Sequence, residues 1–225
     1  MGWIDEAFAA MAARSSGSVV DRDAALPGRD EPMPVAPANL VTGNPMLPPF
    51  PKGHESLVVG MGCFWGAEKR MWELDGVWTT AVGYAGGWTP NPTYEEVCSG
   101  RTGHTEAVLV VFDPAVLPVR ELLARVYESH DPTQGMRQGN DTGTQYRSAV
   151  YCSTAEQLRV AEELAAEYEK VISEAGFGPM TTEFALLDEL RSGAFHYAED
   201  YHQQYLLKNP GGYDCHARTG LACPV

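Results

Sequence analysis

The sequence is poor in basic residues. It holds 16 lysines and arginines against 30 aspartates and glutamates, which gives a formal net charge of −14 at pH 7 and an isoelectric point of about 4.7. Proteins that bind nucleic acids need a basic surface to neutralise the phosphates, and no basic cluster is visible. The composition therefore argues against a nucleic-acid partner, and the acidic excess is expected to favour solubility.

Long hydrophobic runs are also missing. The apolar stretches fall far short of the roughly 20 residues that a membrane-spanning helix needs. Residues 1–14 include Asp5 and Glu6, and they lack the basic start and the long apolar stretch of a signal peptide. We therefore expect no membrane segment, and the cytoplasm is the default location.

Paired cysteines and glycine-rich cofactor motifs are absent as well. The sequence has an odd number of cysteines and no Cys-x-x-Cys pair, so neither the disulfide framework of a secreted protein nor zinc-ligand spacing is indicated. Gly60 and Gly62 lack the third glycine of a dinucleotide-binding motif. These patterns indicate neither a zinc site nor a dinucleotide-binding site. Each cysteine is then either a buried small hydrophobic residue or a reactive thiol. The cysteines are Cys63, Cys98, Cys152, Cys215 and Cys223.

Proline is concentrated near the N-terminus. Residues 18–55 contain too many prolines for a regular helix or a central strand, and too many apolar side chains for a pure linker. We expect residues 1–55 to form a short helix and then an extended arm that lies on the domain. Residues 56–208 are expected to form the α/β domain that carries the chemistry, and residues 209–225 a flexible tail.

Between these arms, hydrophobic patterning alternates between strand-like and helix-like segments. Strands are expected at 57–61, 77–83, 105–112, 148–152 and 181–187. Helices are expected at 67–74, 94–98, 119–130 and 194–205, with a further helix capped by Thr154. Long loops separate several strands. The pattern therefore predicts an α/β (α+β) fold, a single two-layer domain with a mixed sheet flanked by helices and long coil arms at both termini.

The most informative stretch surrounds Cys63. Apolar residues run into Gly62-Cys63-Phe64-Trp65-Gly66, and a helical pattern follows. Cys63 is expected at the helix N-terminus, where unpaired N–H groups and the helix dipole favour a thiolate, so it is a candidate nucleophile. The glycines would allow a ligand to approach the backbone closely. Phe64 and Trp65 are either core residues or an apolar wall for a small group such as a methyl.

Two further polar groups could assist such a thiol. Glu106 lies in the apolar segment 105–112, where a buried carboxylate is costly, so it is expected to hold a proton that it can donate. A charge on an exposed edge strand is the alternative. Asp141 and Tyr146 belong to a polar, glycine-rich loop that is either solvated or binds a polar substrate oxygen.

The tail carries two cysteines among glycines and prolines. Cys215 and Cys223 are either idle terminal thiols or thiols that convert a sulfenic acid to a disulfide and pass that disulfide onward. Cys98 and Cys152 have no comparable surroundings and are expected to be structural.

A series of ordered motifs resembles the class A peptide methionine sulfoxide reductase family. The motifs are GCFWG at 62–66, GYAGG at 83–87, TYEEVCSG at 93–100, TGHTEA at 102–107, HDP at 130–132, QGNDTGTQYRS at 138–148 and AEDYHQQYL at 198–206. AALPGR at 24–29 is similar to the arm of long bacterial members. The similarity extends from about residue 24 to the tail, and the sequence is identified as a member of this family.

The resemblance implies a role for several residues in the first chemical step. Cys63 would attack the sulfoxide sulfur, and Phe64 and Trp65 would form the pocket for the S-methyl group. Glu106 would give a proton to the sulfoxide oxygen. The oxygen would be bound or polarised by Tyr94, Asp141 and Tyr146.

The resemblance also implies how the enzyme is reset. Cys63 would become a sulfenic acid, Cys215 would form a disulfide with it, and Cys223 would exchange to give a Cys215–Cys223 pair that thioredoxin reduces. The substrate would be the S epimer of methionine sulfoxide, free or in proteins, with no cofactor. We expect a monomer. The tail departs from the family pattern because Asp214 stands between Tyr213 and Cys215, which leaves open which tail cysteine reacts first.

Two other functions fit parts of the sequence. One is an acyl-transfer or protease-type thiol enzyme that pairs Cys63 with a histidine such as His104 or His202. The other is a non-enzymatic binder of methionine-rich partners or a redox sensor. Neither of them requires Glu106 together with the tail cysteines.

Overall fold

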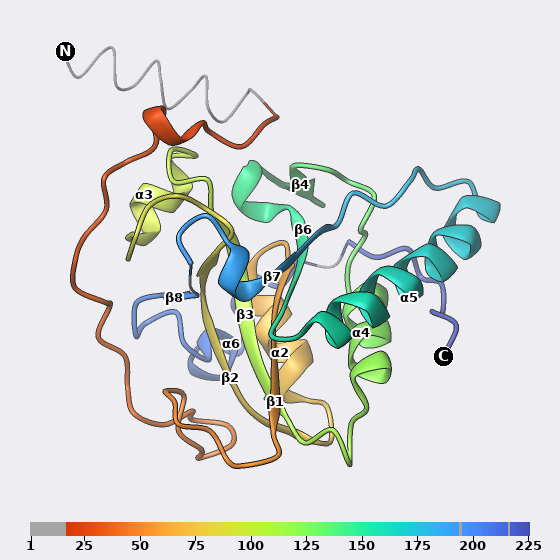
Figure 1. Ribbon diagram of the computed structural model, residues 1–225, viewed down its shortest axis with the longest axis horizontal. Coiled ribbons are helices and arrows are strands. Elements are labelled where there is room, and N and C mark those ends of the chain that lie inside the picture. The colour runs from red at the N-terminus through yellow and green to blue at the C-terminus, as the bar shows by residue number, and fades with distance from the viewer. Residues whose placement is uncertain (1–16, 194, 216) are drawn as a thin grey trace.

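A computed structural model describes residues 17–193, 195–215 and 217–225 (Figure 1). Most of the helix expected within residues 1–17 lies outside the described residues. The main sheet has the strand order β7-β6-β1-β3-β2-β8, and its pairs are antiparallel except for β6 with β7. The strands of this sheet are β1 (Glu55–Met61), β2 (Val77–Ala85), β3 (Thr105–Phe112), β6 (Ser148–Cys152), β7 (Glu183–Leu186) and β8 (His196–Tyr197). The expected mixed sheet is confirmed.

Helices connect and cover these strands. The helices are α2 (Phe64–Trp72), α3 (Tyr94–Cys98), α4 (Val119–Glu128), α5 (Ala155–Glu174) and α6 (Tyr205–Lys208), with short 3-10 turns at η1 (Arg22–Ala24), η2 (Thr144–Tyr146) and η3 (Leu187–Glu189). Thr154 caps α5 by accepting a hydrogen bond from the Gln157 backbone N–H, as expected. None of the described helices is long and apolar enough to cross a membrane.

The sheet buries both of its faces. Alternate β1 residues such as Leu57 and Val59 join one apolar cluster with side chains of α2, α4 and α5. Val58 points the other way and joins a second cluster that includes Met46 of the N-terminal segment. Helices thus cover one face of the sheet, and coil segments cover part of the other.

The proline-rich segment packs against the sheet. Met46 is fully buried, and the Asn39 Nδ2 group donates to the Thr80 backbone oxygen of β2 at 2.9 Å. Figure 1 shows this segment, coloured red to orange, running along the side of the molecule opposite to α5. Its apolar side chains therefore supply core contacts to a sheet face that no long helix covers within the described part of the chain.

The helix expected at 194–205 is wrong. Ala194 lies outside the described residues, His196–Tyr197 form strand β8 beside β2, turns follow, and α6 begins only at Tyr205. The Gln203 side chain accepts from the Val82 N–H at 2.8 Å and donates to the Val82 carbonyl at 2.8 Å. These non-local bonds to the sheet outweigh the helical preference of the segment.

The polar loop at 131–144 also contains structure that the sequence did not predict. A small hairpin pairs β4 (Arg137–Gln138) with β5 (Asp141–Thr142). The hairpin holds Gln138 against the backbone of Gly62: a Cβ atom at position 62 would lie 2.6 Å from the Gln138 Cβ. Gly62 also has a φ of 87°, a conformation that favours glycine.

Candidate active site

Cys63 is the N-cap residue of α2, so the helix begins three residues earlier than expected. The thiol is buried, with 7% of the residue exposed. Burial raises its pKa well above the ordinary 9.0, with a smaller contribution from the Glu106 charge, while the Trp65 and Gly66 N–H groups act in the opposite direction. The expectation that the helix N-terminus gives a net preference for the thiolate is therefore wrong, because desolvation outweighs the N–H groups.

Glu106 lies on β3 and is 1% exposed. Its Oε2 atom accepts a hydrogen bond from the Phe64 backbone N–H at 2.9 Å, at the first residue of the helix that Cys63 caps. Burial raises the pKa of Glu106 from 4.5 to about 8, while the Phe64 N–H opposes the shift. The carboxyl group thus keeps its proton at neutral pH, and this side chain is buried rather than at an exposed edge.

Aromatic rings surround the start of α2. Phe64 stacks with Tyr94 at a centroid distance of 6.5 Å, and Trp65 stacks with Tyr205 at 3.9 Å. The indole Nε1 of Trp65 donates to His202 Nδ1 at 3.0 Å, which fixes the orientation of the indole. The residues predicted for the sulfoxide site did not include Tyr205, and His202 was considered only as a base for Cys63 in an acyl-transfer enzyme. The only available signal was their place in the 198–206 motif, since their position depends on the turns that replace the expected helix.

Asp141, on β5, and Tyr146, in η2, line one hollow. Burial raises the pKa of Tyr146 and of Tyr94 above 10.0, with a further contribution from Glu106, so both phenols remain hydrogen-bond donors. Cys98 lines the same hollow and is hydrogen-bonded to Tyr94. The sequence had offered a purely structural role for this cysteine.

Cys215 lies in the tail but shares a small cavity with Cys63. The cavity is also lined by Gln138, and the Cys215 thiol approaches the Gln138 carbonyl at 3.6 Å. The tail residue Tyr213 donates from its hydroxyl to the Asp141 Oδ2 atom at 3.1 Å. The structure therefore brings one tail cysteine to the candidate nucleophile.

The second tail cysteine lies elsewhere. Cys223 is 4% exposed and packs in the helix-covered core. Its backbone N–H donates to the Glu128 Oε1 atom at 2.8 Å, while the Tyr168 hydroxyl is hydrogen-bonded to Thr219 and to the Leu221 carbonyl. Burial raises the pKa of Cys223 to about 12. Cys223 does not line the cavity of Cys63.

No histidine among the described residues is hydrogen-bonded to Cys63. His104 Nε2 is bonded to the Thr89 carbonyl at 2.7 Å, and burial lowers its pKa to about 3. His202 accepts from Trp65, and both ring nitrogens of His130 are bonded to the Val126 carbonyl and to Ser148. The geometry of a Cys–His acyl-transfer site is therefore not found in the described part of the chain.

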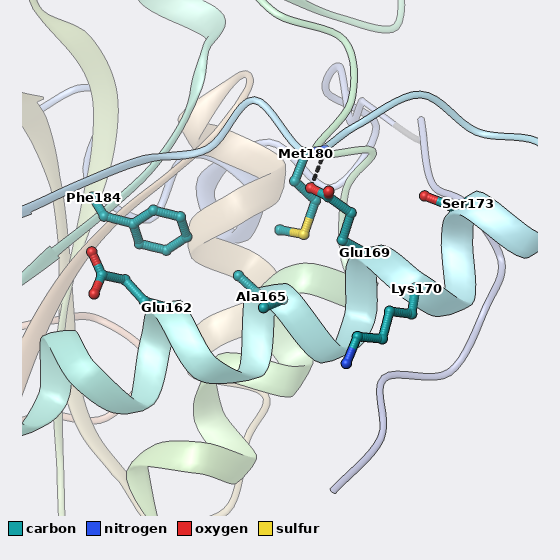
Figure 2. Close-up of a pocket in the computed structure, with 8 residues that line it drawn as sticks. Glu162, Ala165, Glu169, Lys170, Ser173, Met180 and Phe184 are labelled. Atoms are coloured by element: carbon teal, nitrogen blue, oxygen red, sulfur yellow. Dashed lines mark hydrogen bonds between the residues drawn. The ribbon is translucent and has the colours of Figure 1, made fainter.

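Another hollow lies between α5 and the segment that leads into β7. Figure 2 shows Met180 and Phe184 facing the helix across it, with the Met180 N–H donating to Glu169 at 2.9 Å. No predicted site residue lines this hollow. Within the described ranges, no cluster of histidine, cysteine, aspartate and glutamate could hold a metal ion.

Comparisons with known proteins agree with this geometry. A family model described as peptide methionine sulfoxide reductase matches residues 55–223. The chain is 60% identical to the peptide methionine sulfoxide reductase MsrA of Azotobacter vinelandii, over 89% of this chain and 90% of that protein. It is 55% identical to the mitochondrial peptide methionine sulfoxide reductase of Homo sapiens, over 94% of this chain and 88% of that protein.

A solved structure gives the same result. Methionine sulfoxide reductase A of Corynebacterium diphtheriae aligns with a TM-score of 0.83 at 48% identity, covering 92% of this chain and 99% of that one. The conclusion from sequence, fold and site geometry is that the chain belongs to the class A peptide methionine sulfoxide reductase family.

Proposed function

We propose that this protein reduces methionine S-sulfoxide, free or in proteins, with Cys63 as the nucleophile. The observation that carries the proposal is the juxtaposition at the start of α2. Cys63 is the N-cap residue of the helix, the proton-holding Glu106 accepts from the next backbone N–H, and Cys215 lines the cavity of Cys63. A nucleophile, an acid and a second thiol are the three groups that sulfoxide reduction by cysteine requires.

In the first step, the S-methyl group lies against Phe64 and Trp65, while the sulfoxide oxygen faces Glu106. Tyr94 and Tyr146 donate hydrogen bonds to that oxygen, and Asp141 acts beside them. Cys63 attacks the sulfur as a thiolate, and Glu106 protonates the oxygen as negative charge builds on it. The oxygen passes to Cys63, methionine leaves, and the proton released by the thiol replaces the one that Glu106 gave.

In the second step, Cys215 attacks the Cys63 sulfenic acid. The two thiols become a disulfide, and the oxygen leaves as water. Cys223 then exchanges with this disulfide and frees Cys63, and thioredoxin reduces the resulting Cys215–Cys223 pair. Because Cys223 is packed in the core beside Glu128, this exchange requires the end of the tail to leave its present contacts.

The domain division, oligomeric state and location belong to the same proposal. We assign residues 1–55 as the arm, 56–208 as the catalytic domain and 209–225 as the recycling tail. We also propose that the protein is a monomer and acts in the cytoplasm, a compartment that keeps thiols reduced.

The test is a coupled assay of the purified wild-type protein with thioredoxin, thioredoxin reductase and NADPH. We expect turnover of methionine S-sulfoxide and background rates with the R epimer. A redox sensor would oxidise Cys63 without releasing methionine. No release of methionine from the S epimer, even with dithiothreitol, would overturn the proposal.

A further inference from the structure

Arg70 joins the helix of the nucleophile to the tail of the resolving cysteine. It lies on α2, one turn after Gly66, and its Nη1 group donates to the Gly66 carbonyl and to the Asp214 Oδ1 atom, both at 2.7 Å. Its Nη2 group donates to the Cys215 carbonyl at 3.1 Å. One guanidinium thus binds the backbone of the nucleophile's helix, the residue before Cys215, and Cys215 itself.

The contact is half-buried and closely fitted. The side chains of Arg70 and Asp214 are 11% and 23% exposed, so this ion pair is less screened than a surface pair. A Cβ atom at position 66 would overlap the Asp214 carboxylate. Because Gly66 has no side chain, the Asp214 carboxylate of the tail can lie directly against the backbone of α2.

This part of the tail also contacts the β4–β5 hairpin. Tyr213 is 43% exposed and makes one hydrogen bond to Asp141, and the Cys215 thiol has a long contact to the Gln138 carbonyl. The Arg70 contacts are the ones with a charged donor, and such bonds are about twice as strong as neutral ones. They therefore restrain where Cys215 lies relative to Cys63.

We infer that Arg70 and Asp214 form a positioning pair that holds Cys215 beside Cys63 for the resolution of the sulfenic acid. The inference rests on the proposed function. The Cys215 thiolate attacks the Cys63 sulfur, an S–S bond forms and the S–O bond breaks. The leaving hydroxide takes up the proton that Cys215 lost, so the products are a disulfide and water. The Cys63 sulfur is reduced and Cys215 is oxidised.

The pair also explains the residue that separates Tyr213 from Cys215. Asp214 stands directly between Tyr213 and Cys215 in the sequence. A carboxylate at that position finds its partner on α2, and the Cys215 carbonyl is fixed by the same guanidinium. The ion pair thus fixes which residue of the tail lies at the cavity of Cys63.

The test measures two steps separately in the absence of reductant. Arg70→Ala and Asp214→Asn are mixed with methionine S-sulfoxide, quenched at intervals, and assayed for methionine and for the Cys63–Cys215 disulfide by mass mapping. Lys69→Ala is the matched control, because Lys69 neighbours Arg70 on α2, is 40% exposed and pairs only with Glu73 among the described residues. Dimedone reports the lifetime of the sulfenic acid.

We expect both variants to release about one methionine per protein at nearly the wild-type rate, because Cys63 and Glu106 are untouched. Disulfide formation should slow about tenfold to a hundredfold, the range for a reacting group that loses its alignment, and dimedone labelling of Cys63 should rise. The Arg70→Lys variant should recover part of the rate. Arg70→Ala combined with Asp214→Asn should be little worse than Arg70→Ala alone, because the two side chains act as one unit.

Disulfide formation at the wild-type rate in both single variants would overturn the inference. So would an equal fall in methionine release and disulfide formation, because that result indicates general damage to α2. Should Arg70→Ala fail to fold, Asp214→Asn on the tail gives the same two measurements. Failure of the proposed function is distinct, because the wild-type protein would then release no methionine at all.

Discussion

Cys63 and Cys223 are both almost fully buried, and burial is the main cause that raises the pKa of each thiol. Their polar surroundings differ. Cys63 has the N–H groups of Trp65 and Gly66 at a helix start and the protonated carboxyl group of Glu106 nearby. The Cys223 backbone N–H is held by the carboxylate of Glu128, whose charge further disfavours a thiolate.

Burial alone therefore does not identify a reactive thiol. Burial makes both thiols poor nucleophiles at rest, but only Cys63 lies where N–H groups can stabilise a thiolate and where an acid can protonate a leaving oxygen. Burial and the Glu128 carboxylate both disfavour the thiolate of Cys223. Substitutions that change the surroundings of one thiol at a time should show which steps depend on Cys63 and which on Cys223.

The largest effect is expected from Cys63→Ser. A serine hydroxyl cannot form the sulfenic acid, so methionine production from the S-sulfoxide with dithiothreitol should fall to background. Cys152→Ala is the matched control: Cys152 is a fully buried thiol of β6, and its pKa is also raised to about 12 by burial. Retained turnover in Cys63→Ser would show that the comparison assigns the wrong thiol.

Glu106→Gln should reduce the rate of the sulfoxide step by about 10²–10⁴, the range for a positioned general acid. In the wild-type protein, this step should decline as the pH rises through about 8, where Glu106 loses its proton. The variant should lack that decline. Single-turnover methionine release between pH 6 and pH 9.5 measures both effects, and a decline near pH 8 that persists in the variant would exclude Glu106 as its origin.

The raised pKa of Glu106 also predicts that the stability of the fold changes with pH. The folded protein binds the Glu106 proton more tightly than the unfolded chain, because the pKa is about 8 in the fold and 4.5 ordinarily. The contribution of Glu106 to the free energy of unfolding therefore decreases as the pH rises from 4.5 to 8. Urea unfolding should show Glu106→Gln gaining stability relative to wild type over this interval; a constant difference would contradict the raised pKa.

Cys223 should react slowly with iodoacetamide in the reduced, folded protein. A pKa of about 12 leaves about a thousandth of the thiolate fraction of an ordinary cysteine, so labelling should be about 10³-fold slower than in the urea-unfolded chain. Mass spectrometry of the peptide that contains Cys223 follows the reaction. Equal labelling rates in the folded and the urea-unfolded protein would show that Cys223 is not buried as described.

The smallest effect is expected from loosening the anchor of Cys223. Tyr168→Phe removes the hydroxyl that bonds to Thr219 and Leu221, and Glu128→Gln weakens the bond to the Cys223 N–H. Each substitution should speed labelling of Cys223 about threefold to tenfold, which corresponds to a net loss of about 1 kcal/mol in the contacts that hold the tail. Glu121→Gln, an exposed charge on α4, is the control and should leave the rate unchanged.

Local sequence information was sufficient where a segment's own residues decide its structure. The strands at 105–112 and 148–152, the turn of helix at 94–98 and the Thr154 cap agree with the structure because alternation and capping are local signals. For Glu106 the sequence left two interpretations open, a carboxyl group buried with its proton or a charge on an exposed edge strand, and the structure shows the buried one.

Predictions from the sequence were wrong where contacts between distant segments determine the local structure. The segment at 194–205 has helical composition, but Gln203 bonds to Val82 on β2, and the Gln204 N–H donates to the buried Glu68 carboxylate of α2 at 2.8 Å. The pKa of Cys63 was also misjudged, since the helix N-terminus is visible in the sequence but the depth of burial is not.

Several features of the proposed site are visible in the sequence alone: a cysteine at a strand-to-helix turn, two aromatic residues after it and a carboxyl group in an apolar strand. Only the tertiary structure decided which tail thiol lies beside that cysteine. Both cysteines belong to the same glycine-containing tail, whose local preferences do not distinguish them. Contacts with Arg70 on α2 hold Cys215, and contacts with Glu128 on α4 and Tyr168 on α5 hold the end of the tail with Cys223. The two cysteines therefore lie in separate places.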